Sequence, residues 1–230
     1  MNNRINTPLL ILPCAGGSAA NYRGYTKYYK NVIIYEYPGH WAKIDEHLDE
    51  SFDKMVECMV DSVSGQVDND DIIVLGHSMG ALVGYASIEC FRKRHITVRG
   101  LYVAASYCPY SSVNTFNKIE SDIDIYRFLK NISGISDKII GSDFFKENML
   151  PAIKNDFKIL KMLKNSRYLD QQEAIPITGL YGEDDTLVSY IDIVKWKMYS
   201  SGTFKVARYK GDHFFVTADN NIREIIAEIK

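Results

Sequence analysis

A serine flanked by glycines stands between a buried strand and a helix, and this arrangement constrains the fold more than any other part of the chain. The motif of residues 76–80, Gly-His-Ser-Met-Gly, follows the apolar run of residues 71–75 and precedes the helical pattern of residues 81–86. Such a sharp turn strains the serine backbone, and a Cβ on either glycine would strike the neighbouring strand or helix. The sequence therefore predicts a nucleophile elbow that presents Ser78 at the edge of a sheet.

Two later segments supply a carboxylate and a histidine, in the chain order serine, aspartate, histidine that is expected of an α/β-hydrolase. A carboxylate-rich turn, which holds Asp184 and Asp185, follows the apolar strand pattern of residues 175–181. A loop that holds His213 follows the strand pattern of residues 203–209. Because parallel strands gather their carboxyl ends at one edge of a sheet, both loops are expected to open beside the serine.

The chemistry of a serine nucleophile requires these residue types. A hydroxyl is a weak nucleophile until a base removes its proton, and histidine suits this task because its ordinary pKa of about 6.5 is close to neutral pH. A carboxylate then orients the imidazole ring and stabilises the imidazolium. We prefer Asp185 in that role because it stands three residues after Gly182 and leads into a helical pattern, and Asp184 is the alternative.

A glycine-rich turn after the first strand pattern is expected to complete an oxyanion hole. The backbone amide of Met79, directly after the serine, supplies one donor. The apolar residues 9–12 lead into the turn, where Gly16 and Gly17 allow backbone amides to come close to a substrate. The turn has neither the lysine of a P-loop nor the spacing of a dinucleotide-binding motif, which argues against a phosphate site.

Five separate blocks together resemble the type II thioesterases, free-standing α/β-hydrolases associated with nonribosomal peptide synthetases and polyketide synthases. The blocks are Pro13-Cys14-Ala15-Gly16-Gly17-Ser18-Ala19 with Tyr22-Arg23, Tyr37-Pro38-Gly39, Gly76-His77-Ser78-Met79-Gly80-Ala81, Gly182-Glu183-Asp184-Asp185 and Gly211-Asp212-His213-Phe214-Phe215. A further segment, residues 150–157, is similar to the helical lid of that family. The resemblance covers nearly the whole chain, and the blocks occur in the family's order.

The resemblance implies a catalytic triad of Ser78, Asp185 and His213, with the amides of Ala15 and Met79 as oxyanion donors. It also implies hydrolysis of acyl thioesters on the phosphopantetheine arm of carrier proteins, which edits stalled or misprimed nonribosomal peptide and polyketide synthases. The expected partner is therefore an acyl-loaded, phosphopantetheinylated carrier protein, with no nucleic acid and no membrane. The resemblance implies no metal and no organic cofactor.

Two residues depart from the family's usual pattern. The family usually has histidine where this chain has Cys14, and arginine where it has His40. Neither position belongs to the expected triad. Both are expected to affect the hydrogen bonds that shape the mouth of the pocket.

Composition agrees with one enzyme domain. A chain of 230 residues that is 46% hydrophobic can bury a sizeable core, so we expect residues 1–230 to form a single α/β-hydrolase domain. The net charge of -2 gives no sign of nucleic-acid binding. The 4 cysteines have no C-x-x-C spacing, so the sequence indicates neither a zinc site nor a disulfide framework, and buried free thiols are expected.

Strand and helix patterns alternate along the chain, which is typical of a mostly parallel, doubly wound sheet. Strands are expected near residues 8–12, 31–36, 71–75, 99–105, 175–181 and 203–209, and helices near residues 20–29, 50–66, 79–94, 187–199 and 219–229. Residues 106–170 are too long for a plain loop and carry helical patterns near residues 123–129 and 152–163. This insertion separates the serine from the acid and is expected to form a helical lid over the site.

The second of these lid helices carries lysines beside an apolar stripe. The apolar residues of one face are Ile153, Phe157, Leu160 and Leu163, and the lysines of the adjacent face are Lys154, Lys158 and Lys161. We favour a solvated edge beside a buried stripe. The alternative is a basic landing patch for an acidic carrier protein, to which charge complementarity would steer the partner.

The remaining histidines and tryptophans are expected to have structural roles. His77 is expected to point away from the serine and to have no catalytic role. Surface or capping positions are expected for the three histidines outside any acidic cluster, which are His40, His47 and His95. Trp41 and Trp196 are expected to be packing anchors.

The sequence favours the cytoplasm. The first fifteen residues contain a basic residue and an apolar stretch, but the stretch is short for a secretory signal and is needed as the first strand. No run approaches the roughly 18 apolar residues of a membrane span.

Other functions remain compatible with the motifs. A small-molecule carboxylesterase or lipid hydrolase would use the same triad without a carrier protein, and is the main alternative. An acyltransferase would pass the acyl group to an amine or alcohol, and a noncatalytic binding module would show no turnover.

Overall fold

The computed structural model describes residues 7–67, 70–132, 137–166 and 171–229, and within these ranges the strands form one six-stranded sheet. The strands are β1 (Leu9–Leu12), β2 (Val32–Ile34), β3 (Asp71–His77), β4 (Thr97–Ala104), β5 (Ile177–Gly182) and β6 (Phe204–Tyr209). Their order is β2-β1-β3-β4-β5-β6, and each neighbouring pair is parallel. The chain winds outward from β1 in both directions, which confirms the predicted doubly wound α/β-hydrolase fold.

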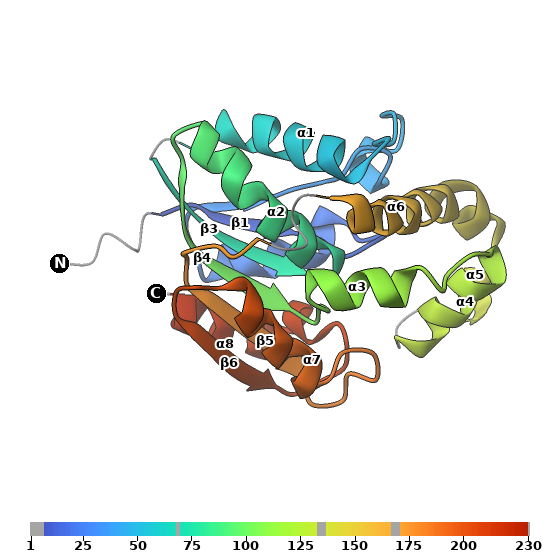
Figure 1. The fold of residues 1–230 in the computed structure, drawn as a ribbon. Coiled ribbons are helices and arrows are strands. Elements are labelled where there is room, and N and C mark those ends of the chain that lie inside the picture. Colours follow the sequence, from blue (N-terminus) through green and yellow to red (C-terminus); the bar gives the residue numbers. More distant parts are fainter. Residues whose placement is uncertain (1–6, 68–69, 133–136, 167–170, 230) are drawn as a thin grey trace.

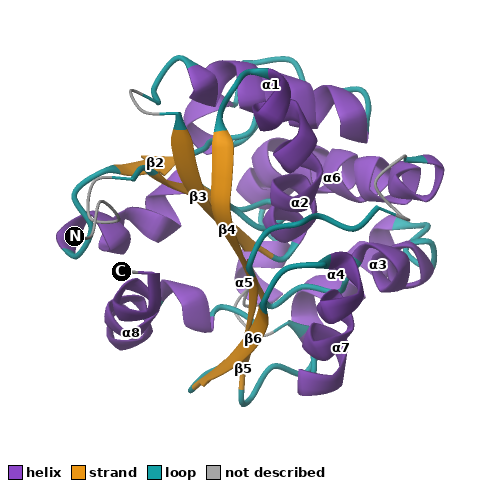
Figure 2. Cartoon of the chain, turned by 60° about the vertical axis from the view of Figure 1, so that its left-hand side comes forward, coloured by secondary structure: helices purple, strands orange, loops and turns teal. Residues whose placement is uncertain are grey.

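Helices cover both faces of the sheet. The flanking helices are α1 (Phe52–Ser64), α2 (Met79–Lys93), α7 (Tyr190–Val194) and α8 (Asp219–Ile229). Figure 2 shows α8 on one side of the strands, with α1 and α2 on the other. Short 3-10 helices span Ala19–Lys27, Trp41–Lys43, Leu163–Asn165, Lys195–Tyr199 and Phe215–Thr217.

Side chains of β1 alternate between two hydrophobic cores, because successive residues of a strand point to opposite faces. Leu10 and Leu12 pack in the core that holds α1, α2 and the inner side of the segment between β4 and β5. Leu9 and Ile11 pack with Tyr22, Tyr25 and the apolar face of α8. Since all four of these β1 residues are fully buried, β1 lies in the middle of the molecule, and its carboxyl end is held in place from both sides.

Between β4 and β5 the chain forms a helical insertion at one end of the molecule (Figure 1). Its helices are α3 (Pro109–Phe116), α4 (Asp122–Asn131), α5 (Asp137–Ile140) and α6 (Leu150–Met162), with a π-helical turn at Phe145–Met149 before α6. Three aromatic rings join α3, α4 and α6, with centroid distances of 5.8 Å from Phe116 to Phe157 and 5.1 Å from Phe128 to Phe157. The apolar stripe of α6 faces inward, since Ile153 and Leu160 are at most 1% exposed.

Several sequence expectations need correction. The helix expected at 20–29 is a 3-10 helix at Ala19–Lys27, and the helix expected at 187–199 is divided into the short α7 and a following 3-10 helix. The sequence analysis also missed α3, which begins at Pro109. Trp196 is fully buried, as a packing anchor should be, but Trp41 is 43% exposed and is not one.

Other expectations agree with the described residues. All 4 cysteines are free, and three of them are buried, with Cys58 partly exposed. None of the described helices is both long and apolar enough to cross a membrane.

The first turn of α2 lies against the end of β1. A Cβ on Gly80 would stand 2.1 Å from the carbonyl oxygen of Leu12 and 2.7 Å from that of Pro13. Both obstacles are backbone atoms, which cannot rotate away as a flexible side chain can. The glycine is therefore required for this approach.

We predict that Gly80→Ala lowers the free energy of unfolding by about 2 to 3 kcal/mol, because the added methyl overpacks a backbone contact. Gly65→Ala is the matched control, since nothing lies within 4 Å of its Cβ position and its φ of -70° suits alanine. This control is expected to change stability by less than about 1 kcal/mol, in the stabilising direction. Urea unfolding of the two variants checks the contrast, and equal losses would contradict it.

Candidate active site

Ser78 occupies the sharp turn between β3 and α2, with φ 53° and ψ -114°. A non-glycine residue rarely adopts a positive φ, so the surrounding packing must hold this strained conformation. The Ser78 amide donates to the carbonyl of Ala104 (2.8 Å), and the Ser106 hydroxyl donates to the Ser78 carbonyl (2.9 Å). A Cβ on Gly76 would stand 2.4 Å from the backbone nitrogen of Ala81, so glycine is needed on this side of the turn too.

His213 and Asp185 form a buried pair on the loops after β6 and β5. Nδ1 of His213 lies 3.0 Å from Oδ2 of Asp185, and the two side chains are 2% and 0% exposed. The other carboxylate oxygen accepts the amides of Leu187 (2.8 Å) and Val188 (3.1 Å). Asp184 is exposed instead, and its backbone amide donates to the carbonyl of Gly211. The structure therefore brings Asp185, and not Asp184, against the histidine.

The pKa of Asp185 is lowered from its ordinary value. Burial alone would raise this pKa, but the hydrogen bond from His213, the charge of its ring and the two amide donors outweigh burial. The carboxylate is therefore ionised at neutral pH, and it accepts the Nδ1 proton of His213. That leaves Nε2 of the neutral ring as the nitrogen with a free lone pair.

His77 links two loops of the site through the back of the elbow. Its Nδ1 lies 2.7 Å from the Tyr22 hydroxyl, and its Nε2 lies 2.9 Å from the backbone carbonyl of His213. The Tyr22 oxygen also accepts the amide of Cys14 (3.2 Å), so its own proton goes to Nδ1, and Nε2–H of His77 donates to His213. The hydrogen bonds of the His77 ring thus hold the loop that carries His213.

Burial, followed by the charge of His213, lowers the pKa of His77 to about 3. The ring is therefore neutral throughout the physiological range. Neutrality also suits its hydrogen bonds, because the cation would place a proton on both nitrogens and repel the Tyr22 proton.

The turn after β1 leaves one of its backbone amides free. The Cys14 amide donates to Tyr22, the Gly16 amide to Oδ2 of Asp156 (2.8 Å), and the Gly17 amide to the carbonyl of Cys14 (2.9 Å). The amide of Ala15 has no partner among the described residues, and neither does that of Met79 at the start of α2. Two unused donors thus flank the ends of β1 and β3, which run side by side with Leu12 opposite Gly76.

His40 is buried, contrary to the expectation of a surface or capping position. It is 2% exposed, and its Nε2 lies 2.9 Å from the same Asp156 oxygen that binds Gly16. The sequence analysis missed Asp156 altogether, because 116 residues separate it from His40 and no local pattern connects them. His47 and His95 are exposed, as expected.

A narrow groove lies between the turn after β1 and the start of the lid. It is lined by Gly16, His40, Trp41, Ile44, Phe144, Asn148, Met149 and Ala152. The indole N–H of the exposed Trp41 donates to the carbonyl of Gly16 (3.1 Å), which explains why this tryptophan is not packed inside. A larger hollow at the amino ends of β3, β4 and β5 lies away from all of these groups, and is lined by residues such as Asp71, Arg99 and Thr178.

Cys14 does not provide a second nucleophile beside the serine. Burial raises the pKa of its thiol to about 11, so the thiolate is absent at neutral pH. No group of three or more metal-ligating side chains occurs among the residues that the structure describes.

Comparison with known proteins identifies the family. The thioesterase domain family matches residues 7–230. The chain belongs to the thioesterase family. Its activity is therefore thioester hydrolysis, and both the family resemblance and the enzyme class predicted from the sequence are confirmed.

Three similar proteins are described as thioesterases. Thioesterase PikA5 of Streptomyces venezuelae is 25% identical over 215 residues, which cover 90% of this chain and 75% of PikA5. The solved structure of RedJ, a thioesterase from the prodiginine pathway of Streptomyces coelicolor, has a TM-score of 0.83 at 22% identity and covers 98% of this chain and 88% of RedJ. The type II thioesterase BorB from the borrelidin cluster has a TM-score of 0.77 at 26% identity and covers 97% of this chain and 93% of BorB.

Replacing Asp185 by asparagine is expected to lower kcat by roughly 10³- to 10⁴-fold, because the amide no longer fixes the His213 tautomer. Asp184→Asn is the matched control, since that side chain is exposed, and we expect nearly normal kcat. Steady-state hydrolysis of a small acyl thioester checks both variants. A larger loss in Asp184→Asn would show that the acid has been assigned wrongly.

His77→Gln is expected to make the protein less sensitive to acid. The folded pKa of about 3 lies below the ordinary 6.5, so the unfolded chain binds this proton first, and folding loses stability as pH falls below about 6.5. The loss reaches at most about 1.4 kcal/mol per pH unit for this single group. Unfolding free energies of wild type and variant, measured between about pH 4 and pH 7, should therefore converge as pH falls. A constant difference would contradict a neutral buried His77.

Proposed function

We propose that this thioesterase removes acyl groups from the phosphopantetheine arm of carrier proteins, with Ser78, His213 and Asp185 as its catalytic triad. The proposal is supported by the strained Ser78 at the turn after β3, by the buried His213–Asp185 pair on the loops after β6 and β5, and by two unused backbone amides at the ends of β1 and β3. A nucleophile, a base with its orienting acid, and oxyanion donors are the parts that acyl transfer requires.

In the first half of the reaction, Ser78 Oγ attacks the thioester carbonyl while Nε2 of His213 accepts its proton. The ionised Asp185 stabilises the imidazolium that forms. The tetrahedral oxyanion accepts hydrogen bonds from the amides of Ala15 and Met79. The C–S bond then breaks, and the imidazolium gives its proton to the leaving thiolate of the arm.

Water completes the reaction. His213 takes a proton from the water, and the resulting hydroxide attacks the acyl-serine. The second tetrahedral intermediate uses the same two amides, and its collapse releases the carboxylic acid. Ser78 regains its proton from His213. The protein thus returns to its starting state with no cofactor consumed.

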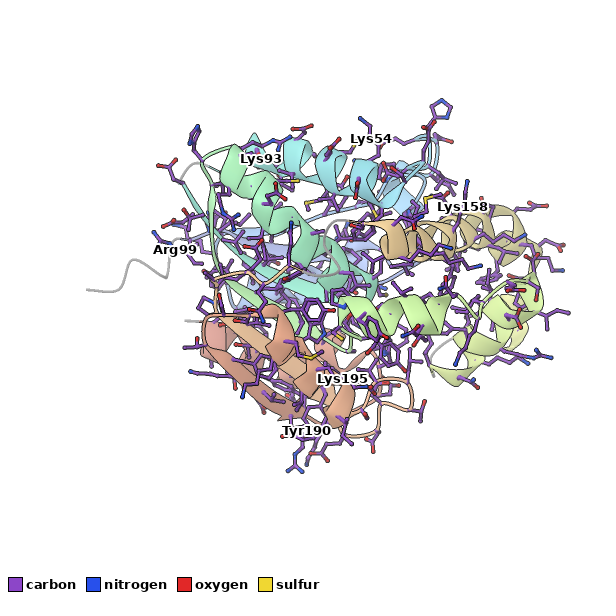
Figure 3. All side chains as sticks on the ribbon, in the orientation of Figure 1. Lys54, Lys93, Arg99, Lys158, Tyr190 and Lys195 are labelled. Carbon is purple, nitrogen blue, oxygen red and sulfur yellow. The ribbon has the colours of Figure 1, made fainter. Side chains whose placement is uncertain are left out.

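The carrier-bound substrate and the editing role are supported by similar proteins of known structure. YbtT is described as a type II thioesterase from the yersiniabactin NRPS/PKS pathway, and ClbQ comes from the colibactin NRPS/PKS pathway. In this reading the helical insertion of residues 106–170 is the lid over the acyl group. The lysine-rich side of α6 agrees better with a solvated edge than with a strong basic patch, because Lys154 is paired with Asp122 (2.7 Å). Lys158 is exposed on α6 (Figure 3).

The decisive experiment is deacylation of an acyl-loaded carrier protein, followed by intact mass spectrometry. We expect wild type to release the acyl group and Ser78→Ala to leave it in place, because the alanine has no nucleophile. An aryl ester of the same acyl group is assayed in parallel. Turnover of the aryl ester without carrier deacylation would favour a small-molecule esterase instead.

A further inference from the structure

The lid contributes a buried charge to the turn that follows β1. Asp156 of α6 is fully buried, and its Oδ2 accepts both the Gly16 amide (2.8 Å) and Nε2 of His40 (2.9 Å). Its Oδ1 finds no hydrogen bond among the described residues. A buried charge without hydrogen-bond donors is costly. The donors that offset the desolvation of this carboxylate all bind Oδ2, the oxygen that contacts the turn.

The geometry of His40 indicates a cation. Its Nδ1 lies 3.0 Å from the carbonyl of Pro38, and its Nε2 faces the carboxylate of Asp156. Both partners are acceptors, so both ring nitrogens must carry protons. Burial lowers the pKa of His40, but the hydrogen bond and charge of Asp156 outweigh burial, and the pKa is raised above its ordinary value.

Other charged and polar groups surround this pair. They are Glu36, Tyr37, Lys43 and Asp49, contributed by the segments after β2 and before α1. Glu36 raises the pKa of His40, and its own carboxylate accepts the amide of Ala19 and the hydroxyl of Ser18. Burial, followed by the charge of Asp156, raises the pKa of Asp49. The acidic surroundings therefore favour the His40 cation.

The turn of residues 14–17 could adopt either of two backbone conformations. Gly17 donates to Cys14, which closes a four-residue turn with Ala15 and Gly16 in the middle, and Gly16 has φ +65°. A positive φ at this third position is the mark of a type II turn, whose central peptide is flipped relative to a type I turn. Flipping that peptide would turn the Ala15 carbonyl toward the Asp156 carboxylate, where the Gly16 amide now lies. The negative charge of Asp156 disfavours that alternative.

A second contact ties the lid to the same glycine. A Cβ on Gly16 would stand 2.5 Å from Cγ1 of Ile153, which is one turn before Asp156 on α6. Helix α6 thus reaches the turn with both an apolar and a charged side chain. The peptide that follows Gly16 is held as well, because the indole N–H of Trp41 donates to the Gly16 carbonyl.

We propose that Asp156 is a positioning residue, which, paired with His40, holds the Gly16 amide. It thereby fixes the turn on which the adjacent Ala15 amide, part of the preceding peptide, faces the reacting oxygen. Docking of the lid helix and assembly of the oxyanion hole are then one event. The inference rests on the proposed role of Ser78 and Ala15, but it does not depend on which acyl donor the enzyme uses.

The test compares Asp156→Asn with Asn155→Ala. Asn155 holds the same helix to the body through the carbonyl of Asp49 (2.9 Å) and does not touch the turn, so it controls for loosening of the lid. The first readout is the rate at which a fluorophosphonate labels Ser78, because its P=O oxygen occupies the oxyanion position. The second is kcat and KM on a small acyl thioester.

We expect Asp156→Asn to slow labelling and kcat by roughly 10- to 100-fold with little change in KM, because oxyanion contacts act in the transition state. Asn155→Ala should stay within about threefold of wild type in both readouts. Equal effects of the two variants would overturn the proposal. Normal labelling of wild type without thioester turnover would count against the proposed function and leave this comparison intact.

His40→Gln tests the pair without altering the lid helix. The ratio of wild-type to variant labelling rates should fall as pH rises from about 6 to 9, because only the wild type loses a charge there. Any pH dependence that the two proteins share cancels in the ratio. A ratio that stays flat would show that His40 carries no functional charge, and would overturn its part in the proposal.

Discussion

The close contact between the first turn of α2 and the end of β1 is the constraint on which the site depends. Gly80 brings the two backbones nearer than any side chain would allow, and this forces Ser78 into its positive φ. The same contact sets the Met79 amide and the turn after β1 at a fixed separation. The proposed nucleophile and the proposed oxyanion donors therefore depend on one packing contact, and the sheet supplies the rigidity that such precision requires.

The sequence predicted what is encoded locally. Apolar runs ending in glycine located the strands, and the parallel order of those strands implied that Asp185 and His213 meet. The sequence did not predict that His40 is buried or that Asp156 is its partner, because their contact depends on how α6 packs against the turn after β1. The prediction that Trp41 is a packing anchor was wrong for a related reason. Its indole N–H donates to a backbone carbonyl at the surface, and the ring does not fill a core. Tertiary contacts between distant segments leave no periodic signal.

The buried histidines His77 and His40 differ in charge, and their neighbouring groups explain the difference. His77 faces a hydroxyl and a carbonyl, with no ionised partner in direct contact, so burial prevails and the ring is neutral. His40 meets a carboxylate at hydrogen-bond distance, and the charge prevails over burial. The His77 ring holds the loop that carries His213. The His40 ring contacts Asp156 and so links α6 to the segment beside the turn after β1. Local partners, and not depth of burial alone, decide the protonation state.

The order of the active-site segments along the chain has a consequence for biosynthesis. In the proposed site the serine and both amide donors precede β4 in the chain, whereas the acid and the base follow β5 and β6, the last two strands to emerge from the ribosome. A domain generally folds as a unit, so the loops that carry Asp185 and His213 take their places only after β5 and β6 have been synthesised. A nascent polypeptide thus carries an unactivated hydroxyl until its final strand docks.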